Sequence, residues 1–141
     1  MKVASFPGKW CFLIAALGII GCGGKEIYQV KGKVVYEDGA DVSVLAKAMV
    51  VFDPADEDGP KVSARGEVQP DGSFQMSTYK EGDGVVPGKY RVALAPPPFL
   101  GGRGKARPQL LDPIYQDYET SGLEITVTGP VTDYSVKVKK P

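Results

Sequence analysis

Four carboxylates lie close together near the middle of the chain and form its densest group of possible cation ligands. They are Asp53, Asp56, Glu57 and Asp58. Calcium is a hard cation that binds carboxylate and carbonyl oxygens, so this segment would suit a calcium-dependent adhesion module. The spacing lacks the ligand order of an EF-hand, and the Gly59-Pro60 pair that follows is typical of a turn. We therefore expect a solvated loop and no metal site, with calcium binding as an alternative.

Hydroxyl nucleophiles are present, but the usual base that activates them is missing. The 141 residues include no histidine, which excludes Ser-His-Asp and Cys-His relays and imidazole-bound zinc. A serine hydroxyl needs an adjacent base. We therefore expect no catalytic residue, no cofactor and no enzymatic activity. The 17 basic residues balance 17 acidic ones, which also argues against a nucleic-acid partner.

Three of the seven tyrosines fall at strand ends or in loops, where their rings would be accessible to a sugar. These are Tyr79, Tyr115 and Tyr118. Packing in the fold is the expected role of these three rings, and carbohydrate binding is an alternative function of the protein. The other four occupy inward positions of expected strands and are predicted core residues: Tyr28, Tyr36, Tyr90 and Tyr134.

A long segment at 95–113 is rich in proline, glycine and basic residues. Arg103, Lys105 and Arg107 lie within it, and no acidic residue occurs between Phe99 and Leu111. Structureless loops of this length are uncommon in compact domains and are often functional. Cations in such a loop would contact anionic lipid headgroups or an acidic polymer. We therefore take the three cations as the candidate interaction residues.

The elements that must position these residues are short strands. From 28 to 36, Tyr28, Val30, Gly32, Val34 and Tyr36 share one face, and most residues between them are polar or charged. This period of two predicts a half-buried strand. Six further segments follow the pattern: 48–52, 62–68, 73–76, 90–94, 123–127 and 134–138.

Turn signals separate the predicted strands. Asp-Gly pairs begin at positions 38, 58, 71 and 83, and glycine accepts positive φ without steric cost. With no long helical pattern after residue 22, this spacing predicts an all-β, seven-stranded antiparallel sandwich. A small closed barrel is the alternative architecture.

The N-terminal residues have the features of an export signal. Lys2 and Lys9 precede an uncharged apolar run over 10–21, which as a helix would rise only about 18 Å, too little for a hydrocarbon core of about 30 Å. A basic start, a short apolar region and a small residue before the cleavage point predict a signal peptide over 1–21.

The end of this signal resembles the lipobox of bacterial lipoproteins. Its residues are Ile19-Ile20-Gly21-Cys22. The resemblance implies that Cys22 is lipidated and anchors the chain to a bacterial membrane, followed by a short linker over 22–27. Gly23 differs from the aspartate that commonly retains lipoproteins at an inner membrane, so the sorting rule implies the outer membrane in a cell that has two.

Four segments in order resemble small bacterial lipoproteins with a carboxypeptidase-regulatory-like, transthyretin-like domain. They are 46–54 (AKAMVVFDP), 66–74 (GEVQPDGSF), 81–92 (EGDGVVPGKYRV) and 113–123 (PIYQDYETSGL). The resemblance implies a Greek-key sandwich over 28–141 and a non-catalytic accessory role. Lys47 stands where the family usually has glycine, which predicts a remodelled turn.

These observations together predict a lipid-anchored cell-envelope protein without catalysis. Its expected role is structural or in protein interaction, with the membrane and an envelope protein or glycan as partners. The 95–113 loop is the expected contact surface.

Overall fold

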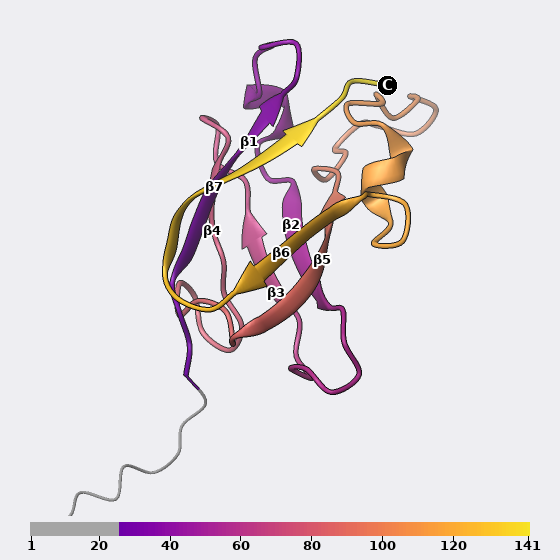
Figure 1. Cartoon of the computed structure of the whole chain (residues 1–141). Helices are drawn as coiled ribbons and strands as arrows, with labels where there is room; N and C mark the ends of the chain where they lie inside the picture. Colours follow the sequence, from indigo (N-terminus) through magenta and orange to yellow (C-terminus); the bar gives the residue numbers. More distant parts are fainter. Residues whose placement is uncertain (1–25) are drawn as a thin grey trace, which may run out of the picture.

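Seven strands in two sheets make up the regular structure of the computed structural model, which describes residues 26–141 (Figure 1). They are β1 (Val30–Tyr36), β2 (Met49–Pro54), β3 (Ala64–Glu67), β4 (Ser73–Gln75), β5 (Gly88–Ala95), β6 (Leu123–Val127) and β7 (Val131–Val138). Two single turns of 3-10 helix, η1 (Ser43–Leu45) and η2 (Pro113–Gln116), complete it. The predicted all-β class and the seven strands are confirmed. Lys2, Lys9 and Cys22 lie outside the described residues.

Two sheets face each other as a β-sandwich. One has the strand order β4-β1-β7, and the other has the order β3-β2-β5-β6. Alternation along the strands directs apolar side chains between the sheets, as in β1, where Val30 and Val34 are fully buried. Within residues 26–141, no helix is long and apolar enough to cross a membrane.

The prediction of a wholly antiparallel sandwich is wrong at one pair of strands. β1 and β7 run parallel, with Val34 opposite Val136 and Tyr36 opposite Val138. Parallel neighbours need a long crossover connection. Because β1 is the first strand and β7 the last, the whole domain between them serves as that connection.

The two edges of the sandwich differ. β3 is joined to the segment after β4 by an isolated bridge in which Arg65 and Ser77 exchange hydrogen bonds of 2.9 and 2.8 Å. β6 and β7 belong to different sheets and do not pair with each other. The sheets therefore stay open on that side, and the alternative of a closed barrel is wrong for this chain.

Aromatic rings connect the two sheets through the core. Tyr134 makes edge-to-face contacts with Phe52 across the sandwich and with Phe74 in its own sheet, at centroid distances of 6.0 and 6.5 Å. Phe52 also packs against Tyr90 at 5.9 Å. Tyr36 and Tyr90 are buried, and Tyr28 and Tyr134 pack against the core. The inward placement predicted for these four tyrosines is confirmed.

Turns follow the predicted glycines, and all four Asp-Gly pairs lie between strands. Lys47 adopts φ 69°. Its backbone N–H donates a 2.8 Å hydrogen bond to the carbonyl of Val68. The turn before β2 therefore holds a lysine in the left-handed conformation that glycine tolerates best.

The chain enters the sandwich at one end, and the 95–113 loop lies at the other (Figure 1). Before β1, Tyr28 exchanges backbone hydrogen bonds with Val85, close to the start of β5. At the last residue of β1, the Tyr36 hydroxyl donates a hydrogen bond to the carbonyl of Leu110, which lies beyond the end of β5. β1 and β5 therefore run in the same direction. We call the end that carries η1 and the 95–113 loop the loop end, and the other the β1-start end.

Candidate functional site

The three candidate cations lie in an irregular segment that leaves β5 and returns to the fold at η2. Arg103, Lys105 and Arg107 are all exposed. Among the residues that the structure describes, none of the three makes a salt bridge. Arg107 donates a 2.8 Å hydrogen bond from Nη2 to the carbonyl of Pro97, which ties the two arms of the loop together. The structure thus shows three exposed positive charges in one loop without carboxylate partners.

The loop is held at its base by buried groups. Leu111 is 1 % exposed and belongs to the core. The carbonyl of Leu110 accepts a 2.6 Å hydrogen bond from the hydroxyl of Tyr36. These contacts fix the position of the loop on the sandwich, while every residue of the segment 98–109 is exposed.

Exposed apolar side chains gather at the same end. Leu100 is 94 % exposed and Phe99 39 %, while Val44 of η1 and Ile114 of η2 are 48 and 43 % exposed. In the described residues, the one other large hydrophobic that is comparably exposed is Tyr79, near the β1-start end. Single exposed apolar residues are ordinary, whereas a group of them at one end makes that end a candidate contact surface.

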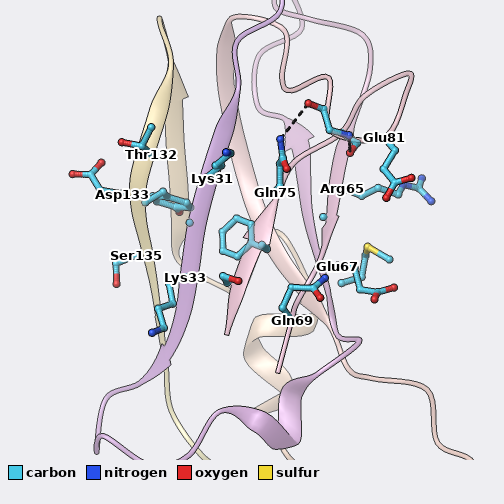
Figure 2. Close-up of a pocket in the computed structure, with 18 residues that line it drawn as sticks. Lys31, Lys33, Arg65, Glu67, Gln69, Gln75, Glu81, Thr132, Asp133 and Ser135 are labelled. Carbon is cyan, nitrogen blue, oxygen red and sulfur yellow. Dashed lines mark hydrogen bonds between the residues drawn. The ribbon is translucent and has the colours of Figure 1, made fainter. Parts of the chain in front are cut away.

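A wide cleft of about 850 Å³ lies over β7, β1, β4 and β3 (Figure 2). Its charged side chains are exposed and belong to no salt bridge among residues 26–141. The positive ones are Lys31, Lys33 and Arg65, and the negative ones are Glu67, Glu81 and Asp133. The sequence analysis did not single out these residues, because they are the outward positions of strands that pair only in the tertiary structure. Their charges cancel, so the cleft favours no charge class of ligand.

The acidic segment does not assemble a cation site. Asp53 lies 3.7 Å from the Arg91 guanidinium and accepts a 3.4 Å hydrogen bond from Ser63. Asp56, Glu57 and Asp58 are exposed in the turn between β2 and β3. Among residues 26–141, no three carboxylate or cysteine side chains are placed to share a metal ion.

The three loop tyrosines do not form one platform for a sugar. Tyr115 is 5 % exposed and packs in the core, so the idea that its ring is accessible is wrong and its packing role is confirmed. A Pro-initiated turn, η2, directs this side chain inward. Tyr118 is half-buried, and Tyr79 is exposed near the β1-start end.

One nucleophile pattern was missed from the sequence. Ser77 and Lys80 have the Ser-x-x-Lys spacing in which a lysine can act on a serine hydroxyl. In the structure, the Ser77 hydroxyl accepts a 2.7 Å hydrogen bond from the backbone N–H of Gly82. Lys80 contributes its own backbone N–H to Asp83 at 3.0 Å. Both residues therefore serve the turn before β5.

No protein-family model matches the chain, and neither curated proteins nor solved structures give a match.

Proposed function

We propose that this chain is a lipid-anchored, non-catalytic cell-envelope protein that binds another envelope component through its loop end. In this proposal Cys22 carries the lipid, and the sandwich is a Greek-key, transthyretin-like domain of the carboxypeptidase-regulatory-like type. Its location is the outer membrane or another exported face of a bacterial membrane. The support for the anchor is the lipobox pattern, and the support for the contact surface comes from the structure.

The observation that supports the loop end as the contact surface is the placement of the loop relative to the start of β1. The seven residues of β1, at about 3.3 Å each, separate the two ends of the sandwich by about 23 Å. An anchor at Cys22 would join the domain at the β1-start end. The loop is therefore not covered by the tether and is free to contact an envelope surface.

The chemistry of the loop end supports binding by charge and apolar contact. Arg103, Lys105 and Arg107 are exposed without carboxylate partners in the described part of the chain, and Leu100 projects beside them. Cations attract an anionic surface, and an apolar side chain gains free energy when it leaves water. The partner should therefore be negatively charged and offer an apolar environment.

The alternatives from the sequence have less support. A glycan platform built on Tyr115, Tyr118 and Tyr79 loses Tyr115 to the core. A calcium-dependent adhesion module would need Asp53 to leave its ion pair with Arg91. A serine-based enzyme would need a base beside its nucleophile, but the chain has no histidine, and the Ser77 hydroxyl accepts a hydrogen bond from the backbone N–H of Gly82.

The contact surface is tested by capture with a purified envelope. The segment 26–141, which contains all seven strands and the core they enclose, is incubated with the envelope of the source organism and crosslinked. We expect saturable capture that is lost when Arg103, Lys105 and Arg107 are changed to alanine. The matched control changes Lys31, Lys61 and Lys80 to alanine, which removes the same charge from exposed positions elsewhere. Equal loss in both triple variants would contradict the proposal.

The anchor is tested separately on the full chain. Cys22→Ser should move the protein from the membrane fraction to the soluble fraction, and mass spectrometry of the unchanged chain should find lipid on Cys22. An unmodified Cys22 in a chain that remains in the membrane fraction would overturn the lipoprotein assignment.

A further inference from the structure

The loop end carries a pattern of side chains that differs from the rest of the described surface. Phe99 and Leu100 are adjacent exposed apolar residues of the loop, and the three cations follow within seven positions of Leu100. No acidic residue interrupts the segment between Phe99 and Leu111. Within the segment 99–111, apolar and positive groups thus face the solvent together without an acidic residue among them.

Leu100 projects into the solvent, while Phe99 lies at the rim of a small hollow. Leu100 is 94 % exposed. The ring of Phe99 lies over Gly101, so closely that a Cβ added there would fall 1.9 Å from its Cζ. This hollow holds about 230 Å³, and Phe99 and Arg107 line it together with the Pro96–Pro98 segment and Val44. This is smaller than the roughly 300 Å³ at which ligand pockets begin.

These features fit a bilayer better than a protein partner. A stable protein interface buries about 800 Å² on each side and requires matched shapes. Here two exposed apolar residues lie among glycines, of which Gly102 and Gly104 have no other group within 4 Å of a Cβ position. A bilayer needs no shape complementarity, because apolar side chains enter the headgroup layer and cations bind the lipid phosphates around them.

We propose that the loop end is a peripheral membrane contact that binds an anionic bilayer. Phe99 and Leu100 enter the headgroup layer, and Arg103, Lys105 and Arg107 bind lipid phosphates. This inference rests on the proposed function for the loop and names the partner as lipid. From Cys22 to Tyr28 the chain spans at most about 21 Å, similar to the length of β1. An anchored domain therefore reaches the same bilayer with its loop end by lying on its side.

The first experiment is vesicle co-sedimentation with no envelope protein present. The segment 26–141 is mixed with phosphatidylcholine vesicles and with vesicles containing 30 % phosphatidylglycerol. We expect binding to the anionic vesicles only, weakened at least tenfold when Arg103, Lys105 and Arg107 are changed to alanine. The Lys31, Lys61 and Lys80 triple variant should bind within twofold of the unchanged segment. Leu100→Ser should weaken binding several-fold without changing the charge.

A spectroscopic test reports the insertion itself. The chain's single tryptophan is Trp10, so the segment 26–141 has none. Leu100→Trp should show a blue shift of its fluorescence and protection from acrylamide on anionic vesicles. Tyr79→Trp, at an exposed position of the β1-start end, should show neither.

Several outcomes would overturn the inference. Equal binding to neutral and anionic vesicles, an unaffected cation triple variant, or equal shifts at positions 79 and 100 would each do so. Cation-dependent capture by the native envelope without binding to lipid vesicles would indicate an acidic protein partner; it would overturn the lipid contact and leave the proposed function standing. Lipid binding by a chain whose Cys22 is unmodified would support the lipid contact and overturn the proposed lipid anchor.

Discussion

The hydroxyl of Tyr36 donates a 2.6 Å hydrogen bond to the carbonyl oxygen of Leu110, 74 positions later in the chain. This bond joins the end of β1 to the returning arm of the 95–113 loop. Asp112 continues the contact, since its backbone N–H lies 3.4 Å from the carbonyl of Lys139 after β7. The loop is thereby fixed against the first and last strands of the domain.

Tyr36→Phe should therefore loosen the base of the loop. The change leaves the Leu110 carbonyl without this partner, which costs about 1 kcal/mol of unfolding free energy. Urea denaturation measures the loss, and amide exchange at Leu111 and Asp112 should become faster. Tyr28→Phe is the control, because the Tyr28 hydroxyl bonds only the exposed Glu26. Unchanged exchange in Tyr36→Phe would show that other contacts hold the loop.

Asp83 organises the turn before β5. Its carboxylate accepts hydrogen bonds from the backbone N–H groups of Thr78, Tyr79 and Lys80, at 2.7, 3.0 and 3.0 Å. Partial burial acts to raise the pKa of Asp83, but these hydrogen bonds outweigh it and hold the pKa below its usual value. The stabilisation is therefore complete above the unfolded-state pKa of about 3.9 and is lost as the pH falls through the lower folded-state value.

Asp83→Asn should lower the unfolding free energy at pH 7 by about 1–2 kcal/mol. It should also flatten the decline in stability between pH 5 and pH 2, since the variant has no carboxylate to protonate at this site. Urea titrations across this range measure both effects. Asp58→Asn, in the exposed turn after β2, should change neither; a similar loss there would mean that general charge and not the turn is responsible.

Lys47 is the one described non-glycine residue with positive φ, at 69°. The left-handed conformation costs about 1–2 kcal/mol for a residue with a Cβ. Glycine avoids this cost, but its greater conformational freedom in the unfolded chain offsets part of the gain. Lys47→Gly should therefore raise the unfolding free energy by about 0.5–1 kcal/mol. Lys47→Ala keeps the conformational cost and should have little effect. Thermal unfolding of the two variants separates the backbone contribution from loss of the lysine charge.

Gly32 lies between two aromatic residues of its own sheet. It pairs with Phe74 on β4 and with Tyr134 on β7. A Cβ at position 32 would lie 2.4 Å from the backbone oxygen of Tyr134 and 2.6 Å from the Phe74 ring. Because the oxygen belongs to a paired strand, Gly32→Ala should destabilise the domain by about 2–3 kcal/mol. Gly102→Ala, which meets no atom within 4 Å, is the matched control in the same denaturation assay.

Burial of tyrosines should limit stability at high pH. Burial raises the pKa of both Tyr90 and Tyr134 to about 12. A pKa raised above the unfolded value of about 10 gives a stabilisation that is complete below pH 10 and is lost as the pH rises through the folded value. Tyr134→Phe keeps the ring contacts and should move the alkaline unfolding midpoint upward by about half a pH unit. A midpoint unchanged by this substitution would assign alkaline unfolding to other groups.

Much of the fold follows from local pattern. The alternation of Val30, Val34 and Tyr36 predicts β1, although Tyr28 forms an isolated bridge outside the strand. The third strand begins at Ala64 and not at Val62, because pairing with β2 stops at Phe52. Local spacing therefore indicates that a strand exists, and its bounds depend on the partner strand.

The candidate site was predictable in composition but not in position. The proline, glycine and basic residues of 95–113 identify an irregular loop in the sequence, and the structure has neither strand nor helix from the end of β5 to Pro113. Tyr115 was not predictable in the same way. Its burial depends on η2 packing on β5, a contact that no local spacing encodes.

The sequence by itself determined which segments are strands, where the Asp-Gly turns lie and which loop carries exposed positive charge, because period-two alternation and glycine conformation are properties of neighbouring residues. Only the tertiary structure decided that β1 and β7 are parallel neighbours and that the 95–113 loop lies at the end of the sandwich opposite the start of β1. These relations arise from hydrogen bonds and apolar contacts between residues far apart in the chain, such as Tyr36 and Leu110. Which residues meet in such contacts depends on how the strands pair and the two sheets pack, and a local sequence pattern does not specify this.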